Sequence, residues 1–182
     1  MNGLALLYVL ACVDDSGKDD PVDTGFALDT AEDTGTPDTD TGNGGGGGAP
    51  DLTSGLWVSE GDDLSALLAY LEVVRVEATF QGSGGYAVVS TDERGDEVTY
   101  AGTYVVDRST VPHGIVMTQT APGAATAEGI WQISDTTLSY EVLQTSPPVP
   151  GCSAPTPEGG FGSTRCSPPL YANANVQTFR LR

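Results

Sequence analysis

The chain has 182 residues, and its 25 acidic side chains outnumber its 7 lysines and arginines, which gives a formal net charge of −18. This length accommodates one ordinary domain and a tail. Because a nucleic-acid backbone or an anionic membrane surface requires a basic footprint, the charge excludes nucleic-acid binding and electrostatic binding to a membrane surface.

The chain begins with an apolar run, Leu4–Ala11, that ends at Cys12 and is followed by an acidic stretch. Residues Val9–Cys12 resemble the lipobox of bacterial lipoproteins. The resemblance implies that residues 1–11 are a signal segment and that Cys12 carries lipid. It places the mature chain outside the cytoplasm, anchored by its acyl chains to a cell-envelope membrane, for which we expect the outer membrane. No Lys or Arg precedes the apolar run, so a secretion signal without lipid and an upstream start codon stay open.

Residues 12–50 form an acidic spacer with little to bury. Between Val13 and Pro50, ten acidic residues face a single base, Lys18, and irregular Asp-Thr repeats lead into the glycine run Gly44–Gly48. Low hydrophobicity with charge of one sign predicts disorder. The irregular spacing of the aspartates argues against a calcium loop. We therefore expect a flexible tether that spans roughly 35 Å.

Residues 51–182 have the composition of an all-β domain, in which short β-branched and aromatic runs alternate with turn residues. The pattern predicts strands over 53–60, 71–81, 86–91, 97–106, 114–120, 128–134, 137–143 and 176–182, and a helix over 64–71. Asp62-Asp63 would cap this helix. Alternation puts the even-numbered residues from Val74 to Phe80 on one face, and those from Val98 to Val106 likewise. Eight strands joined mostly in sequence order predict a closed antiparallel up-and-down barrel.

Four motifs, in this order, resemble those of a family of bacterial lipocalin-like domains of unknown function. They are Gly55-Leu56-Trp57, Ala101–Tyr104, Pro112–Thr118, and Gly129-Ile130-Trp131 leading to Leu138-Ser139-Tyr140. The first is similar to the Gly-x-Trp signature of lipocalins and related calycins. The resemblance covers most of residues 53–182, and it implies an eight-stranded up-and-down barrel without catalysis.

Two more cysteines, Cys152 and Cys166, flank a loop rich in Pro and Gly. With Cys12 assigned to lipid, they remain as an even pair. We predict a disulfide between them, which would contribute roughly 3 kcal/mol in the chain-entropy model and implies an oxidising compartment. Two free thiols are the alternative, and the loop offers too few further ligands for zinc.

No group of residues has the context of a catalytic site, so we predict no enzymatic activity, no cofactor and no metal. His113 lies in a turn without a partner nucleophile, and we expect it to be exposed. The carboxylates of Asp92–Glu97 surround a hairpin tip rather than a cleft. The glycines of Gly82–Gly85 join two strands, not a strand and a helix.

The barrel interior is the remaining candidate site. Six side chains are candidates to line a cavity for one small hydrophobic ligand: Trp57, Val76, Phe80, Tyr104, Trp131 and Phe179. An eight-stranded barrel is just wide enough for side chains to fill it or for one small ligand. Two functions follow: an envelope lipoprotein whose barrel binds such a ligand, and a non-catalytic module with a filled core that contacts an envelope protein. We favour the first and expect a monomer.

Overall fold

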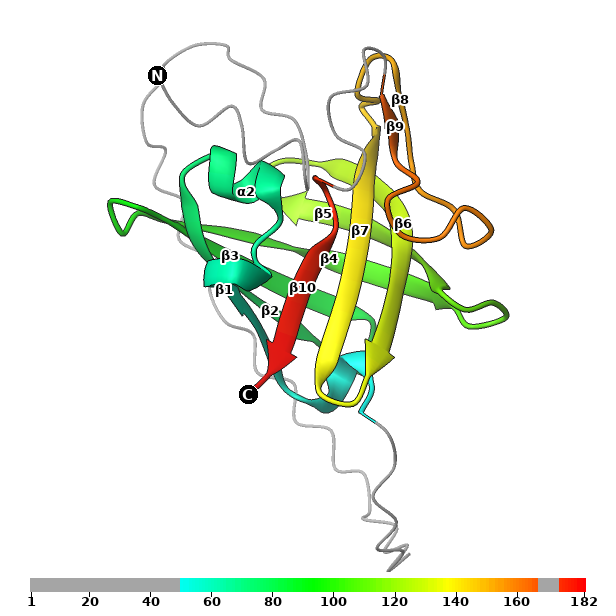
Figure 1. Ribbon diagram of the computed structural model, residues 1–182, viewed down its shortest axis with the longest axis horizontal. Helices are drawn as coiled ribbons and strands as arrows, with labels where there is room; N and C mark the ends of the chain where they lie inside the picture. The colour runs from blue at the N-terminus through cyan, green and yellow to red at the C-terminus, as the bar shows by residue number, and fades with distance from the viewer. Residues whose placement is uncertain (1–49, 167–173) are drawn as a thin grey trace, which may run out of the picture. The chain divides into compact units, whose positions relative to one another are not determined.

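Eight strands form a closed antiparallel barrel in the computed structural model, which describes residues 50–166 and 174–182 (Figure 1). The predicted signal segment and residues 12–49 of the predicted spacer, including Cys12, lie outside these residues. The strands are β1 Leu56–Glu60, β2 Val73–Phe80, β3 Gly85–Asp92, β4 Glu97–Asp107, β5 His113–Ala121, β6 Ala125–Ser134, β7 Thr137–Ser146 and β10 Gln177–Leu181. Their order is β1-β10-β7-β6-β5-β4-β3-β2. The predicted all-β, eight-stranded up-and-down barrel is thus confirmed, and it is compatible with a lipocalin-like fold.

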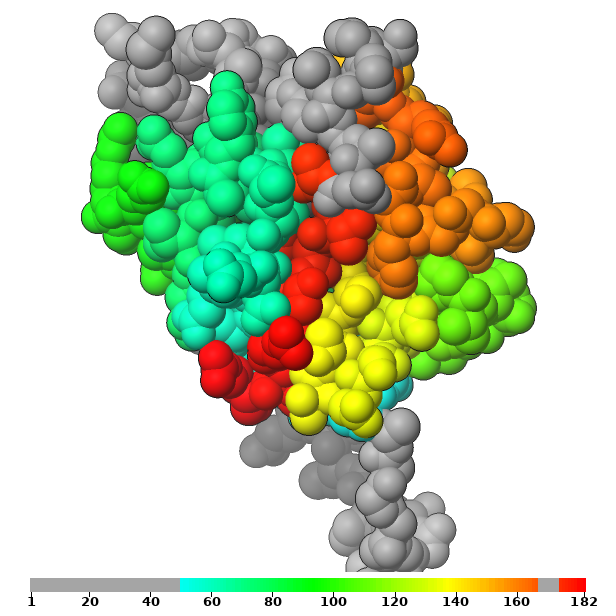
Figure 2. Space-filling view, viewed as in Figure 1, coloured from blue at the N-terminus to red at the C-terminus, as the bar shows by residue number. Residues whose placement is uncertain are grey.

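The last strand closes the barrel. β10 pairs with β7 on one side and with β1 on the other, so every barrel strand has two partners. In Figure 2, β10 (red) runs between the teal N-terminal elements and β7 (yellow). Closure matters because an open sheet would leave a row of unpaired backbone donors and acceptors along each edge.

One short helix, α2 Ala66–Tyr70, follows the single turn η2 Gly61–Asp63. Its N-cap is Ser65, whose hydroxyl accepts a hydrogen bond from the Leu68 amide at 3.3 Å. The predicted Asp62-Asp63 cap is therefore wrong. The extended residue Leu64 separates η2 from α2. The helix therefore begins after Ser65, and this serine caps it in place of the aspartates.

The predicted inward and outward faces of β2 and β4 are correct except at the ends of these strands. On β2, Val76, Ala78 and Phe80 are buried, but Val74 is 41% exposed and Val73 is 5% exposed, opposite to the prediction. The cause is a bulge, since the β2–β3 register shifts between Val73 and Arg75. On β4, Val98 is 40% exposed because it lies at the end of its strand, before the first buried residue.

The two ends of the barrel differ. The first, which we call the η1 end, carries the turn η1 Leu52–Ser54 (Figure 1). There the Trp57 indole donates to the Leu52 carbonyl oxygen at 2.7 Å, and both side chains are fully buried. The other, the α2 end, carries α2 and the β3–β4 hairpin. Large side chains therefore plug the η1 end, whereas a short helix lies over the α2 end.

A disulfide-closed loop packs beside the outer face of β6 and β7 (Figures 1 and 2). Cys152 and Cys166 form the predicted disulfide, and they pair the two-residue strands β8 Cys152–Ser153 and β9 Arg165–Cys166. The loop is held by Glu141 of β7, which is fully buried and accepts hydrogen bonds from the Gly162 amide at 2.6 Å and the Thr164 amide at 3.0 Å. A carboxylate with several donors thus joins the loop to the barrel wall.

Candidate functional site

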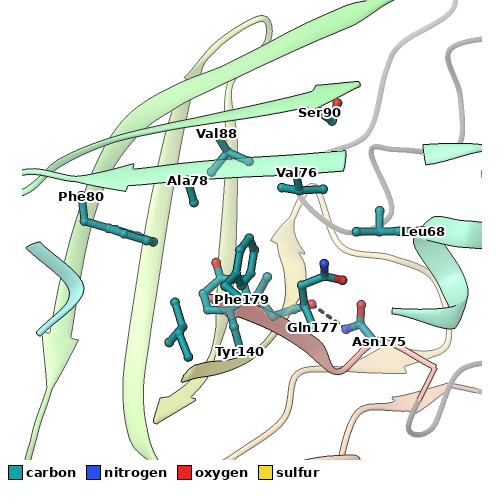
Figure 3. Close-up of a pocket in the computed structure, with 12 residues that line it drawn as sticks. Leu68, Val76, Ala78, Phe80, Val88, Ser90, Tyr140, Asn175, Gln177 and Phe179 are labelled. Carbon is teal, nitrogen blue, oxygen red and sulfur yellow. Dashed lines mark hydrogen bonds between the residues drawn. The ribbon is translucent and has the colours of Figure 1, made fainter. Parts of the chain in front are cut away.

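A cavity of about 30 Å³ lies in the lumen, and it extends from α2 toward Phe80 (Figure 3). Strands β2, β3, β7 and β10 supply most of its wall, and α2 supplies Leu68. Its lining residues are Leu68, Val76, Ala78, Phe80, Val88, Ser90, Leu138, Tyr140, Val142, Asn175, Gln177 and Phe179. Nearly all of the exposed wall is carbon, so an occupant would be held mainly by apolar contact.

The cavity has an apolar end and a polar end. Phe80 lies far from α2 in Figure 3, with Ala78 and Val88 between, whereas Asn175 and Gln177 lie close to Leu68. The Phe179 ring meets Tyr140 edge to face, with 6.2 Å between ring centroids. An occupant would therefore have its apolar part in the barrel and any polar group beneath α2.

The polar end also holds α2 in place. The Gln177 side-chain oxygen accepts from the Ser65 amide at 2.7 Å, and its nitrogen donates to the Ser59 hydroxyl. The Leu67 amide donates to the Ala174 carbonyl oxygen at 3.0 Å. Two backbone amides at the start of α2 are thus bonded to the segment that leads into β10.

Three of the six predicted lining residues meet at this cavity: Val76, Phe80 and Phe179. Trp57, Tyr104 and Trp131 do not line it. Trp57 is fully buried at the η1 end, and Tyr104 stacks edge to face on Phe80 at 5.2 Å and donates to the Gln81 carbonyl oxygen.

Trp131 belongs to a polar cluster at the η1 end. The Arg108 guanidinium lies 4.9 Å from the Trp131 ring centroid and donates twice to Asp51, at 2.7 and 2.9 Å. Burial raises the pKa of Asp51, but the hydrogen bond from Arg108 and the one from the Leu52 amide outweigh it and hold that pKa below its usual range. Trp131 therefore packs against this cluster and is not among the residues that line the cavity.

His113 was predicted to be exposed, and this is wrong. Its ring is half-buried, 4.8 Å from the Trp131 ring centroid, and its Nδ1 lies at hydrogen-bond distance from the Thr110 carbonyl oxygen. At the β3–β4 hairpin the Asp92 side chain supports the turn, because it accepts hydrogen bonds from the amides of Arg94 and Asp96 at 2.8 and 2.9 Å. Glu93, Asp96 and Glu97 are exposed.

The buried tyrosines of the lumen have raised pKa values. Burial raises the pKa of Tyr86 and of Tyr100 to about 12. Burial likewise raises the pKa of Tyr140, whose hydroxyl donates to the Met117 sulfur. These phenols remain protonated, so they act as packing and hydrogen-bonding groups.

Nine of the twelve lining residues are not among the six predicted from the sequence. Three of these nine form the end of the cavity beneath α2: Leu68, Asn175 and Gln177. The helix predicted over 64–71 includes Leu68, but nothing in the sequence pattern indicates which face of that helix turns inward. The two amides are polar residues at the start of a strand, where exposure is the ordinary expectation. Their burial follows from α2 lying over them.

Within 50–166 and 174–182, no three His, Cys, Asp or Glu side chains are placed to hold a metal ion. Over the same ranges, no helix is long and apolar enough to cross a membrane. No protein-family model, curated protein or solved structure matches the chain. The described residues form a small closed antiparallel barrel with an apolar cavity in its lumen.

Proposed function

We propose that this protein is a cell-envelope lipoprotein, anchored through Cys12, whose barrel binds one small and largely apolar molecule beneath α2. The observation that carries the proposal is the carbon-lined cavity between Leu68 and the inner faces of β2, β3, β7 and β10. Concave apolar sites with few polar groups are the usual form of a small-molecule site.

The size of the cavity sets how binding would occur. At about 30 Å³ it exceeds the roughly 10–15 Å³ that one water requires, but it is too small for a long acyl chain. A larger occupant needs α2 to move. Helices of five residues are unstable alone, so α2 depends on its packing and on its bonds to Ala174 and Gln177. Breaking these contacts would open the lumen without disturbing the strand pairing.

The tether and the site are compatible with each other. The described chain begins at Pro50, next to η1, and η1 lies at the opposite end of the barrel from α2. The spacer therefore joins the barrel away from the cavity, and a ligand could enter beneath α2 without meeting the attachment point.

A matched pair of alanines tests the lumen site. Ala78 lines the cavity and is 2% exposed, whereas Ala87 on β3 pairs with Thr79 and lies on the outer face. We expect toluene, followed by methyl NMR of the full chain, to cause saturable shifts at Leu68 and Val76 in the wild type and in Ala87→Leu. Ala78→Leu fills the cavity and should abolish them. Equal binding by both variants would contradict the site.

The anchor is tested separately by intact-mass analysis and acyl labelling of the wild type and Cys12→Ala, produced in a bacterium. The proposal predicts an acylated chain that begins at Cys12, and no label on the variant. A wild-type chain that keeps residues 1–11 without lipid would refute the anchor and leave the lumen site untouched.

A filled-core interaction module is the second candidate. The small volume of the cavity favours it, together with the complete burial of Trp57 and near-complete burial of Trp131. In that case the disulfide-closed loop beside β7 would be the contact surface. Crosslinking in intact cells would then trap a defined protein partner, while toluene would cause no saturable shift.

A further inference from the structure

Asn175 places an unpaired hydrogen-bond acceptor at the polar end of the cavity. The residue is 3% exposed, and its side-chain nitrogen donates to the Val142 carbonyl oxygen at 2.7 Å. This bond defines the amide orientation, because the reversed amide would set two oxygens against each other. Its Oδ1 is buried and has no partner among the residues that the structure describes. In Figure 3 that oxygen points toward the Leu68 side.

The next inward-facing residue of β7 beyond Val142 repeats this arrangement. Gln144 is 1% exposed, its nitrogen donates to the Pro147 carbonyl oxygen, and its Oε1 is buried without a described partner. In both side-chain amides the nitrogen donates to a backbone carbonyl oxygen, and the amide oxygen has no donor within the described part of the chain. This end of the lumen therefore lacks hydrogen-bond donors, not acceptors.

The donors on the cavity wall are already engaged. The Tyr140 hydroxyl donates to the Met117 sulfur, the Gln177 nitrogen donates to Ser59, and the Ser90 hydroxyl donates to the Val98 carbonyl oxygen at 3.5 Å. The Tyr86 hydroxyl is buried without a described partner, but Tyr86 does not line the cavity. None of the twelve lining residues carries a positive charge. A carboxylate or phosphate head would bring a further acceptor and an unpaired charge into an apolar site, which is strongly unfavourable.

An ammonium head is also disfavoured. It would satisfy the Asn175 oxygen, but it would be buried without a counter-charge, since no carboxylate lines the cavity. A neutral hydroxyl or N–H supplies the missing donor and brings no charge. Leaving a buried acceptor unpaired costs more than an ordinary hydrogen bond contributes, so the difference between a donor and a non-donor should be measurable.

We infer that the lumen selects a small neutral molecule with one hydroxyl or N–H donor on an apolar body, and rejects carboxylates of the same size. The donor pairs with Oδ1 of Asn175 beneath α2, and the apolar body extends toward Phe80. This inference rests on the proposed lumen site and specifies its ligand class.

Three six-carbon compounds test the inference by methyl NMR titration of the full chain at pH 7: 1-hexanol, its isomer dipropyl ether, and hexanoate. We expect 1-hexanol to bind about five- to tenfold more tightly than the ether, and hexanoate to cause no saturable shift. In Asn175→Leu the affinities for 1-hexanol and dipropyl ether should become nearly equal, and the affinity for the ether should stay within about twofold of the wild-type value. Gln132→Leu, an amide replaced outside the cavity, should leave the ratio unchanged.

The outcomes separate the two proposals. Equal affinity for alcohol and ether, or tightest binding of hexanoate, would overturn the ligand class while the lumen site stands. Failure of all three compounds to bind would overturn the lumen site itself. The wild-type comparison decides the ligand class even if Asn175→Leu fails to fold, because it needs no variant.

Discussion

Leu68 closes the cavity from α2, and replacing it by alanine measures how much this contact stabilises the barrel. The side chain is 3% exposed and lines the cavity. Leu68→Ala removes about three buried methylene equivalents, worth about 2.4 kcal/mol at about 0.8 kcal/mol each. The enlarged cavity adds to this loss, although a five-residue helix can partly collapse. We expect the free energy of unfolding to fall by about 3 kcal/mol.

Urea denaturation followed by tryptophan fluorescence provides the assay. With a slope of about 1.5 kcal/mol per molar urea, the midpoint should fall by about 2 M. Tyr70 lies on the same helix and is 83% exposed, so Tyr70→Ala should change the free energy by less than about 0.5 kcal/mol. If both variants lost the same small amount, Leu68 would not be packed over the lumen, and the account of α2 as its cover would be wrong.

Three further predictions concern the wall, the buried phenols and the loop. A Cβ at Gly129 would lie 2.1 Å from a β7 carbonyl oxygen. Gly129→Ala should therefore lower the free energy of unfolding, measured by urea denaturation, by at least about 2 kcal/mol. An unchanged free energy of unfolding would contradict that close approach. The pKa values of Tyr86 and Tyr100 are about 12 in the folded protein and near 10 when unfolded, so the free energy of unfolding should fall from about pH 10 to 12, by roughly 1.4 kcal/mol per pH unit for each. Phenolate absorbance near pH 10 that is lost from the folded protein in Tyr86→Phe or Tyr100→Phe would show otherwise. Replacing Cys152 and Cys166 by serine should cost about 3 kcal/mol, and unfolding unaffected by reductant would argue against the crosslink's contribution.

Local patterns in the sequence were sufficient to predict the barrel. Period-two alternation followed by turn residues located all eight strands, because each strand has one face in the core and one in solvent. The same rule failed at Val74, since a bulge inserts one residue and reverses the alternation. The sequence does not indicate this bulge, because Val73 and Val74 are both apolar and either could face inward.

The site was predicted only in part, because it depends on contacts between distant segments. Val76 and Phe179 were identified as inward-facing from alternation alone. Whether an inward residue lies at the plugged end or beside the cavity depends on strand tilt and register, which is why Trp57 and Trp131 were placed wrongly. Asn175 meets Val142, 33 residues away, only once β10 has closed the barrel, so no local pattern indicates it.

Xenon uptake is the sharpest test of an apolar site in the lumen, because a dry apolar cavity takes up this atom without any specific chemistry. Methyl NMR spectra of the full chain would be recorded under increasing xenon pressure. We expect saturable shifts of the Leu68, Val76 and Val142 methyls, which line the cavity, and only weak linear shifts at Val105, which is 71% exposed. Cavity methyls that respond no differently from Val105 would contradict an apolar ligand site in the lumen.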